Sequence, residues 1–155
     1  MAEKDIIVPS IKVEKKGIFD IKELYYIVKK WASDNGYDVL EKSYINRGDS
    51  TEVKLEITRK VDDYTQYEID ITISASNIKI AKTKKKDMYE GSLEVEFESI
   101  LVRDYEGTWE KKPGYRIMRG FFDRFVMKGK IDNYIKELKE ETFLFMENVR
   151  KFLNV

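Results

Sequence analysis

The chain has 155 residues, which suits a single domain spanning 1–155 that can bury a core without disulfides or metal. Lysine plus arginine and aspartate plus glutamate both number 29, so the net charge is zero and no overall field favours nucleic acid or an anionic membrane. Cysteine and histidine are absent, which excludes disulfides, thiolate catalysis and cysteine zinc sites, and removes the commonest general base and metal ligand.

The sequence shows no targeting or membrane signal. Its first ten residues have no cationic region followed by an apolar run, and no apolar stretch reaches the roughly 18 residues of a membrane span. We therefore expect a cytoplasmic protein without a membrane span. Many lysines and glutamates with a single glutamine, Gln66, are typical of a thermophile, although an AT-rich genome gives a similar bias.

The first predicted elements are a strand and a helix. Residues 6–16 alternate loosely and contain Pro9, which cannot donate to a strand ladder, so we expect an edge strand or a lead-in extended segment. Asp20 followed by Glu23 has the spacing of a capping box and predicts a helix start. Asn35-Gly36 predicts the end of this N-terminal helix.

From Tyr37 to Tyr105 the apolar period changes to two, which predicts an antiparallel meander of about five strands with one buried and one wet face. The lysine-rich run 82–86 leads through a short loop into a strand that carries Glu94, Glu96 and Glu98. We expect these lysines to pair with the glutamates across a hairpin, and contact with phosphates is the alternative. The alternation slips after Ser99, which predicts a bulge or bend there.

Two helices are predicted at the C-terminal end. The first spans about 116–128, and Gly129 separates it from the second, which runs from Ile131 to Leu153. The second helix has an apolar stripe with steps of four and three, formed by Ile131, Ile135, Leu138, Thr142, Phe145, Val149 and Phe152. Phe143 and Leu144 lie off this stripe, and we expect the preceding helix or a symmetric dimer contact to cover them.

The predicted fold class is therefore α+β. It consists of an antiparallel sheet of about five to six strands, with an N-terminal helix and two C-terminal helices packed on one face. This order of elements resembles the helix-grip arrangement of Bet v 1 and START-like proteins, in which a curved sheet wraps a long C-terminal helix over an apolar cavity. The run Leu101 to Glu110, together with Arg119-Gly120-Phe121-Phe122-Asp123, is similar to small archaeal proteins of uncharacterised function. That similarity implies a cytoplasmic archaeal protein and no particular activity.

The segment 109–130 is the main candidate for a binding surface. Between Lys111 and Lys130 it has seven basic residues against Asp123 alone, and its arginines share one helical face beside two aromatic residues. Arginine with aromatic residues is a common way to hold single-stranded nucleic acid or phosphate. The alternatives are pairing of Asp123 with Arg119 and contact with the acidic surface of the sheet. The candidate partner-binding or ligand-binding residues are Trp109, Tyr115, Arg116, Arg119, Arg124, Lys128, Phe143 and Leu144.

No pattern in the sequence points to catalysis. Carboxylates are plentiful but no spacing singles out a pair, and the phosphate-binding loop, dinucleotide-binding glycines and calcium loop are missing. We predict a non-enzymatic binding module without catalytic, cofactor-binding or metal-binding residues. It would recognise an apolar small molecule or a protein partner through the sheet and the C-terminal helix. The alternatives are RNA or single-stranded DNA binding through segment 109–130, and a structural role as a subunit of a homo-oligomer.

Overall fold

The computed structural model describes residues 3–82, 87–105, 117–118, 121 and 128–155. Its elements are β1 (Glu3–Phe19), α1 (Ile21–Asp34), β2 (Asp38–Asn46), β3 (Thr51–Lys60), β4 (Thr65–Lys82), β5 (Asp87–Arg103) and α3 (Lys128–Leu153). The described chain is thus a strand, a helix, four further strands and a long helix, which confirms the predicted α+β class.

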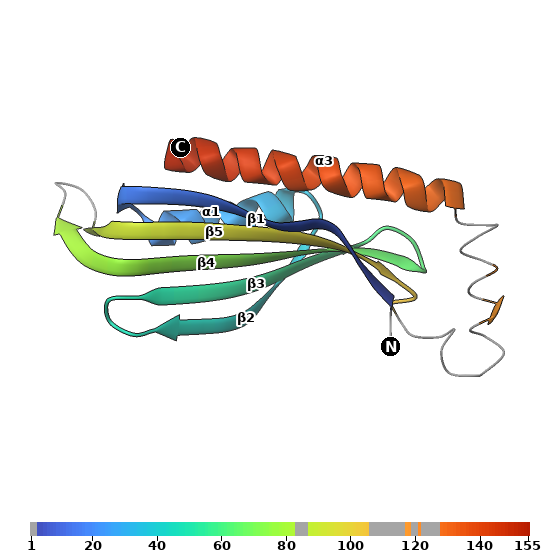
Figure 1. Cartoon of the computed structure of the whole chain (residues 1–155), viewed down its shortest axis with the longest axis horizontal. Coiled ribbons are helices and arrows are strands. Elements are labelled where there is room, and N and C mark those ends of the chain that lie inside the picture. The colour runs from blue at the N-terminus through green and yellow to red at the C-terminus, as the bar shows by residue number, and fades with distance from the viewer. Residues whose placement is uncertain (1–2, 83–86, 106–116, 119–120, 122–127) are drawn as a thin grey trace.

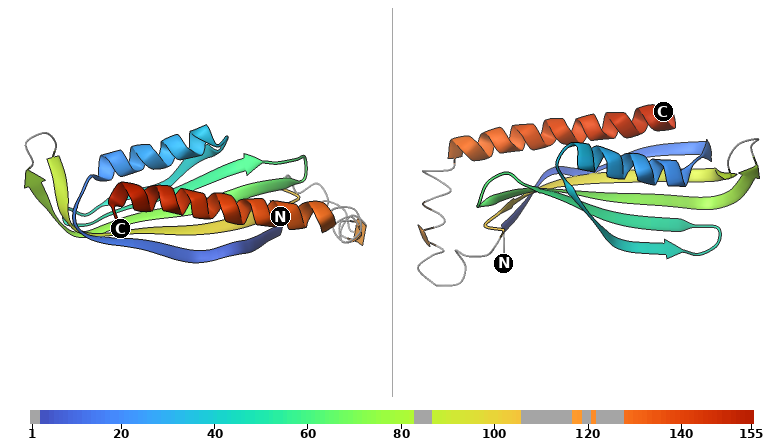
Figure 2. Two further views of the ribbon diagram at one scale, coloured as in Figure 1. Left: turned by 90° about the horizontal axis from the view of Figure 1, so that it is seen from above. Right: turned by 180° about the vertical axis from the view of Figure 1, so that it is seen from behind.

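The five strands form one antiparallel sheet in the order β1-β5-β4-β3-β2. Strands β2 to β5 follow one another as a meander, and β1 pairs with β5, so the first and last strands are neighbours (Figure 1). The predicted edge position of the first strand is confirmed, and α1 carries the chain from that edge to the other edge strand, β2. Both helices lie over the same face of the sheet (Figure 2), which we call the helix face, and we call the opposite face the open face.

Alternation along the strands decides which residues turn toward the helices. The strand register places Leu55, Ile71 and Phe97 side by side across β3, β4 and β5, and all three side chains are at most 1% exposed. The residues between them along each strand turn to the open face and are mostly polar or charged. The sheet therefore contributes one apolar layer to the core, as an apolar period of two requires.

Helix α1 begins and ends where its capping residues predict. The Asp20 carboxylate accepts a hydrogen bond from the backbone N–H of Glu23 at 3.0 Å, which satisfies one of the free N–H groups of the first turn. Asn35 closes the helix, and Gly36 follows with a φ of +79°, a conformation that glycine adopts without strain. Leu24, Val28 and Ala32 form the buried face of α1.

Helix α3 is fixed on the sheet by the predicted stripe. Its buried residues are Leu138, Thr142, Phe145, Val149 and Leu153, while Phe152 is only partly buried. The Phe145 ring stacks on the Trp31 ring of α1 with a centroid distance of 4.1 Å, and it meets the Phe97 ring of β5 edge to face at 5.2 Å. Phe145 therefore joins three elements of the core, namely the sheet, α1 and α3.

The predicted pair of C-terminal helices is wrong for the described residues, which contain one C-terminal helix. Gly129 lies inside the first turn of α3 and does not separate two helices, and Lys128 is the first residue of α3. A glycine costs little there, because the N–H groups of a first turn have no partner within the helix. The predicted helix 116–128 otherwise lies largely outside the described residues, apart from Ile117, Met118 and Phe121, whose side chains are exposed.

Two predictions about strand pairing also need correction. Glu94, Glu96 and Glu98 lie opposite Ser74, Thr72 and Asp70 of β4, and not opposite the lysine run. The reason is that β4 and β5 continue to Lys82 and Asp87, which lie opposite each other. Residues 83–86, which include the other lysines of the run, lie outside the described residues.

The bulge predicted after Ser99 lies in the neighbouring strand. The register between β4 and β5 is unbroken from Arg103 to Ser92, whereas the β1–β5 register shifts between Ile6 and Ile11. The additional residues are in β1 around Pro9, which has no N–H to donate to a ladder.

We predict that Phe145→Ala lowers the free energy of unfolding by about 3 to 5 kcal/mol, because it leaves a cavity where α1, α3 and the sheet meet. Phe143→Ala is the matched control, because the Phe143 side chain is 43% exposed, and we expect it to cost at most about 1 kcal/mol. Denaturant unfolding of the two variants measures the difference. Equal losses would show that Phe145 does not hold α3 on the sheet.

Candidate functional site

The structure describes only part of the predicted binding surface. Trp109, Tyr115, Arg116, Arg119 and Arg124 lie outside the described residues. Lys128 is exposed at the start of α3, and Phe143 and Leu144 are 43% and 66% exposed in its middle. About four helical turns, or roughly 22 Å, separate Lys128 from Phe143, so these residues do not form one patch. The use of this surface remains a prediction.

The space between the sheet and the middle of α3 is filled by the protein's own side chains. Phe145, Trp31 and Phe97 occupy it in ring-to-ring contact. Leu138 and Val149, which lie two turns and one turn from Phe145 on the same stripe, are completely buried. An apolar ligand at this place would have to displace that stack.

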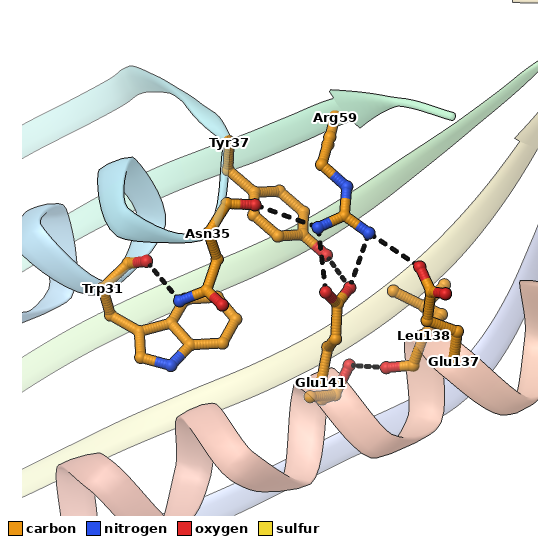
Figure 3. A network of polar contacts seen from close by, with 8 residues as sticks. Trp31, Asn35, Tyr37, Arg59, Glu137, Leu138 and Glu141 are labelled. Carbon is orange, nitrogen blue, oxygen red and sulfur yellow. Dashed lines mark hydrogen bonds and ion pairs between the residues drawn. The ribbon is translucent and has the colours of Figure 1, made fainter. Parts of the chain in front are cut away.

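Arg59, near the end of β3, joins α3 to the end of α1 (Figure 3). Its guanidinium contacts the Glu141 carboxylate at 2.8 Å and the Glu137 carboxylate at 2.8 Å, and it donates a hydrogen bond to the carbonyl oxygen of Asn35 at 2.9 Å. The same group lies 4.9 Å from the centroid of the Tyr37 ring. Glu137 and Glu141 are four residues apart and thus share one side of α3, where they meet a single cation.

Tyr37 belongs to the same network. Its hydroxyl donates a hydrogen bond to Glu141 at 2.7 Å, and its ring is buried against the core. Burial raises the pKa of Tyr37, and the neighbouring Glu141 carboxylate raises it further, so the phenol stays protonated and continues to donate. Because every described member of this network is used inside the fold, we interpret it as a structural clamp.

The open face carries a row of carboxylates across the middle of the sheet. The register places Glu56, Asp70 and Glu98 directly opposite one another on β3, β4 and β5. Glu68, two residues before Asp70 on the same face of β4, is 3% exposed. Like charges directly opposite one another destabilise a sheet, so this row is costly unless protons or cations neutralise it.

Protons and lysines both contribute to that neutralisation. Burial, and then Glu68, Glu56 and Glu98, raise the pKa of Asp70 to about 7, so Asp70 is partly protonated near neutral pH. Lys4 contacts Glu68 at 3.3 Å, and Lys42 contacts Glu56 at 3.2 Å.

These carboxylates are the group among the described residues that could hold a metal. Oxygen atoms of Glu56, Glu68 and Asp70 lie within 4.8 Å of one another, and hard cations prefer such ligands. The lysines already supply positive charge to two of the three, so the cluster is accounted for without an ion. We assign it neither a metal nor a catalytic role.

A groove with an apolar lining lies at the end of the sheet near the β2–β3 and β4–β5 turns, and we call it the end groove. Its volume is about 300 Å³, and its apolar lining comes from Ile21, Tyr44, Ile78, Ile80 and Tyr89. The Tyr44 and Ile80 side chains are 59% and 68% exposed. Lys22 and Asn46 add polar groups to its lining.

A β-bulge in β4 creates the end groove. Three residues of β4 advance from Ser76 to Lys79 while β5 advances by two, so one additional residue shifts the alternation. Ile78 and Ile80 consequently turn to the helix face. Without the additional residue, the alternation of Ile73 and Ala75 would have placed residues 77 and 79 on that face instead. A sequence signal is present, because the apolar positions change from odd to even numbers at Asn77.

The bulge is fixed by backbone contacts. Asn77 has a φ of +53°, and the N–H of Ile78 donates a hydrogen bond to the carbonyl oxygen of Asp49 in the β2–β3 turn at 2.9 Å. A Cβ atom at Gly91 would lie only 2.8 Å from the carbonyl oxygen of Ser76, so the close approach of β5 requires glycine. These contacts therefore fix the backbone conformation of the strand that lines the end groove.

No protein family, curated protein or solved structure compared with the chain is similar to it. Neither described helix combines the length and the apolar composition that a membrane crossing requires.

We predict that Arg59→Met lowers the free energy of unfolding by about 2 to 3 kcal/mol, because it leaves the partly buried Glu141 without its cation. Lys30→Met is the control, since Lys30 forms an exposed ion pair with Asp34, and we expect it to leave the free energy of unfolding nearly unchanged. Urea unfolding compares the two variants. If they lose the same stability, the Arg59 clamp does not hold α3.

We predict that the carboxylate row makes the protein less stable as the pH rises from about 4 to about 7. The folded state holds the Asp70 proton more tightly than the unfolded state, in which the aspartate pKa is about 3.8. The contribution of this proton to the stability of the folded protein is therefore complete below the unfolded pKa. It is lost as the pH rises through the folded pKa. After a discount for solvent screening we expect a loss on the order of 1 to 2 kcal/mol.

The Asp70→Asn variant tests this pH dependence, because it cannot lose the proton. Its unfolding free energy should lack the Asp70 contribution between pH 4 and pH 7 and should exceed that of the unchanged protein at pH 8. Asp34→Asn, on an exposed part of α1, should leave the wild-type profile intact. A profile that Asp70→Asn does not alter would contradict the assignment.

Proposed function

We propose that the protein is a non-enzymatic binding module that holds an apolar segment of a partner protein in the end groove. The observation that carries the proposal is the exposure of Ile80 and Tyr44 beside the partly buried Ile78 and Tyr89. Large apolar side chains that gather in a concave surface with a few polar groups are typical of recognition sites.

A rigid support favours recognition at this groove. The Ile78 backbone is tied to the β2–β3 turn, and Ile21 begins a helix that Asp20 caps. Binding to such a surface costs little conformational entropy of the protein itself. The free energy gained by burying apolar surface in the groove is therefore not offset by a large cost of ordering the protein.

The location differs from the surface expected from the sequence. The middle of the interface between the sheet and α3 is occupied by Phe145, Trp31 and Phe97, which favours a surface groove over a ligand beneath α3. An apolar small molecule in the end groove is the runner-up. The helix-grip likeness, the archaeal origin and the cytoplasmic location stay predictions from the sequence.

The nucleic-acid alternative depends on segment 109–130, of which the structure describes only Ile117, Met118, Phe121 and residues 128–130. It remains a prediction, and it requires affinity that falls steeply as salt rises. Binding of an apolar peptide in the end groove depends mainly on burial of apolar surface and should change little with salt. Salt dependence therefore separates the two functions.

A peptide library tests the proposed function. We expect selection on the full chain to enrich peptides with two or more large apolar residues, and we expect a synthetic peptide of that kind to shift the methyl NMR signals of Ile78 and Ile80. Ile80→Lys should weaken binding at least about 10-fold, because burial of one such side chain contributes about 1.5 to 3 kcal/mol.

Ile6→Lys provides the matched control, since Ile6 is 60% exposed on β1 and is not among the residues that line the groove. It should leave peptide affinity unchanged. Selection that enriches no apolar peptide, or peptides that bind Ile80→Lys as well as the unchanged protein, would remove the proposal.

A further inference from the structure

The two edge strands of the sheet are protected to different degrees. An unpaired edge invites pairing with another strand, and proteins prevent this with proline, bulges and lysines. Strand β1 has Pro9, two register shifts, and lysines at positions 4, 12, 15 and 16. Strand β2 has one register shift and one lysine, Lys42, together with three exposed apolar residues, Leu40, Tyr44 and Ile45.

The pairing of β2 with β3 determines the face of each β2 residue. Leu40, Ser43 and Ile45 lie opposite Glu56, Lys54 and Glu52, which belong to the open face. Val39, Glu41 and Tyr44 lie opposite Ile57, Leu55 and Val53, which belong to the helix face. Lys42 is the additional residue of the register shift, and its ammonium group contacts Glu56 at 3.2 Å.

We propose that β2 pairs antiparallel with β2 of a second copy of the chain, about a two-fold axis between Lys42 and Ser43, so that the two sheets become continuous. In this register Leu40 lies opposite the partner's Ile45 on the open face, and the two-fold axis repeats that contact. Glu41 lies opposite the partner's Tyr44 on the helix face. Every pair then has both members on the same face of the joined sheet.

The register is selective because neighbouring alternatives break this match. A slip by one residue places Leu40 opposite the partner's Tyr44, and these two side chains turn to opposite faces. The chosen register also buries two of the three exposed apolar residues of β2 against each other. Lys42 lies near the axis, where its repulsion from the partner's Lys42 is reduced because each is neutralised by Glu56 of its own chain.

The interface should be weak. A stable dimer typically buries about 1,600 Å² in total, which a nine-residue strand pair alone does not reach. We therefore expect dissociation in the micromolar range or weaker. The inference goes beyond the proposed function, because Ile78 and Ile80 of the end groove take no part in the pairing. Tyr44 belongs to both surfaces, whereas Leu40 and Ile45 do not line the groove.

Sedimentation of the full chain between about 5 and 500 μM tests the dimer. The mass should rise from 18.4 kDa toward twice that value with concentration. Ile45→Lys should weaken the association at least 10-fold, whereas Ile6→Lys on the other edge should leave it unchanged. A monomer at every concentration, or a dimer that responds to Ile6→Lys and not to Ile45→Lys, would overturn the proposal.

The absence of cysteine allows a second test that does not depend on a disruptive change. A mixture of Leu40→Cys and Ile45→Cys chains should form a disulfide-linked heterodimer under mild oxidation, because opposite residues in an antiparallel pair bring their Cβ atoms close enough to be bridged. Each variant alone should crosslink much less, since no residue lies opposite its own copy in this register. Equal crosslinking in all three samples would overturn the assigned register.

The two proposals fail separately. Loss of the dimer with unchanged peptide binding at Ile80 would remove only the edge pairing. A dimer that binds no apolar peptide would remove only the proposed function.

Discussion

The structure depends on the contact that Phe145 makes with Trp31 and Phe97. These three rings come from α3, α1 and β5, and their stacking closes the core where the helices cross the sheet. Because α1 follows β1 along the chain and α3 is the last element, this one contact ties segments more than 100 residues apart. The Arg59 clamp supports it from the side, since Glu137 and Glu141 hold the same helix against β3. Because both helices cover one face, most of the charged side chains in the middle of the sheet lie on the opposite face.

That division explains the chemistry of the open face. The strand register aligns Leu55, Ile71 and Phe97 on the helix face. The same register aligns the adjacent residue of each strand on the open face, so Glu56, Asp70 and Glu98 lie side by side there. The apolar layer therefore determines the carboxylate row, and the row is unfavourable when fully ionised. The raised pKa of Asp70 follows from this arrangement and requires no functional selection.

Local patterns predicted much of the fold, and long-range pairing accounts for what they missed. Alternation predicted the strands, Asp20 and Gly36 predicted the limits of α1, and the spacing from Leu138 to Val149 predicted the buried stripe of α3. Three features were missed, namely the role of Gly129, the partner of Lys82 and the bulge at Asn77. Whether a glycine ends a helix, and which register two strands adopt, both depend on tertiary contacts. The Arg59–Glu141 pair joins residues 82 positions apart, and no local signal connects them. The end groove was missed for the same reason, although the shift from Ala75 to Ile78 was visible in the sequence.

The lengths of the elements explain why the candidate surfaces gather at one end and one edge. At about 1.5 Å per residue α1 spans roughly 21 Å and the 26-residue α3 roughly 39 Å, whereas the 18-residue strand β4 spans roughly 60 Å. Neither helix is long enough to cover such a strand from end to end, so part of the helix face extends beyond each helix. The bulge turns Ile78 and Ile80 into this uncovered region, and the crossover through α1 makes β2 the neighbouring edge. A sheet that extends past its helices therefore offers apolar side chains and an edge strand at the same place, and the proposed contacts with another chain rely on both.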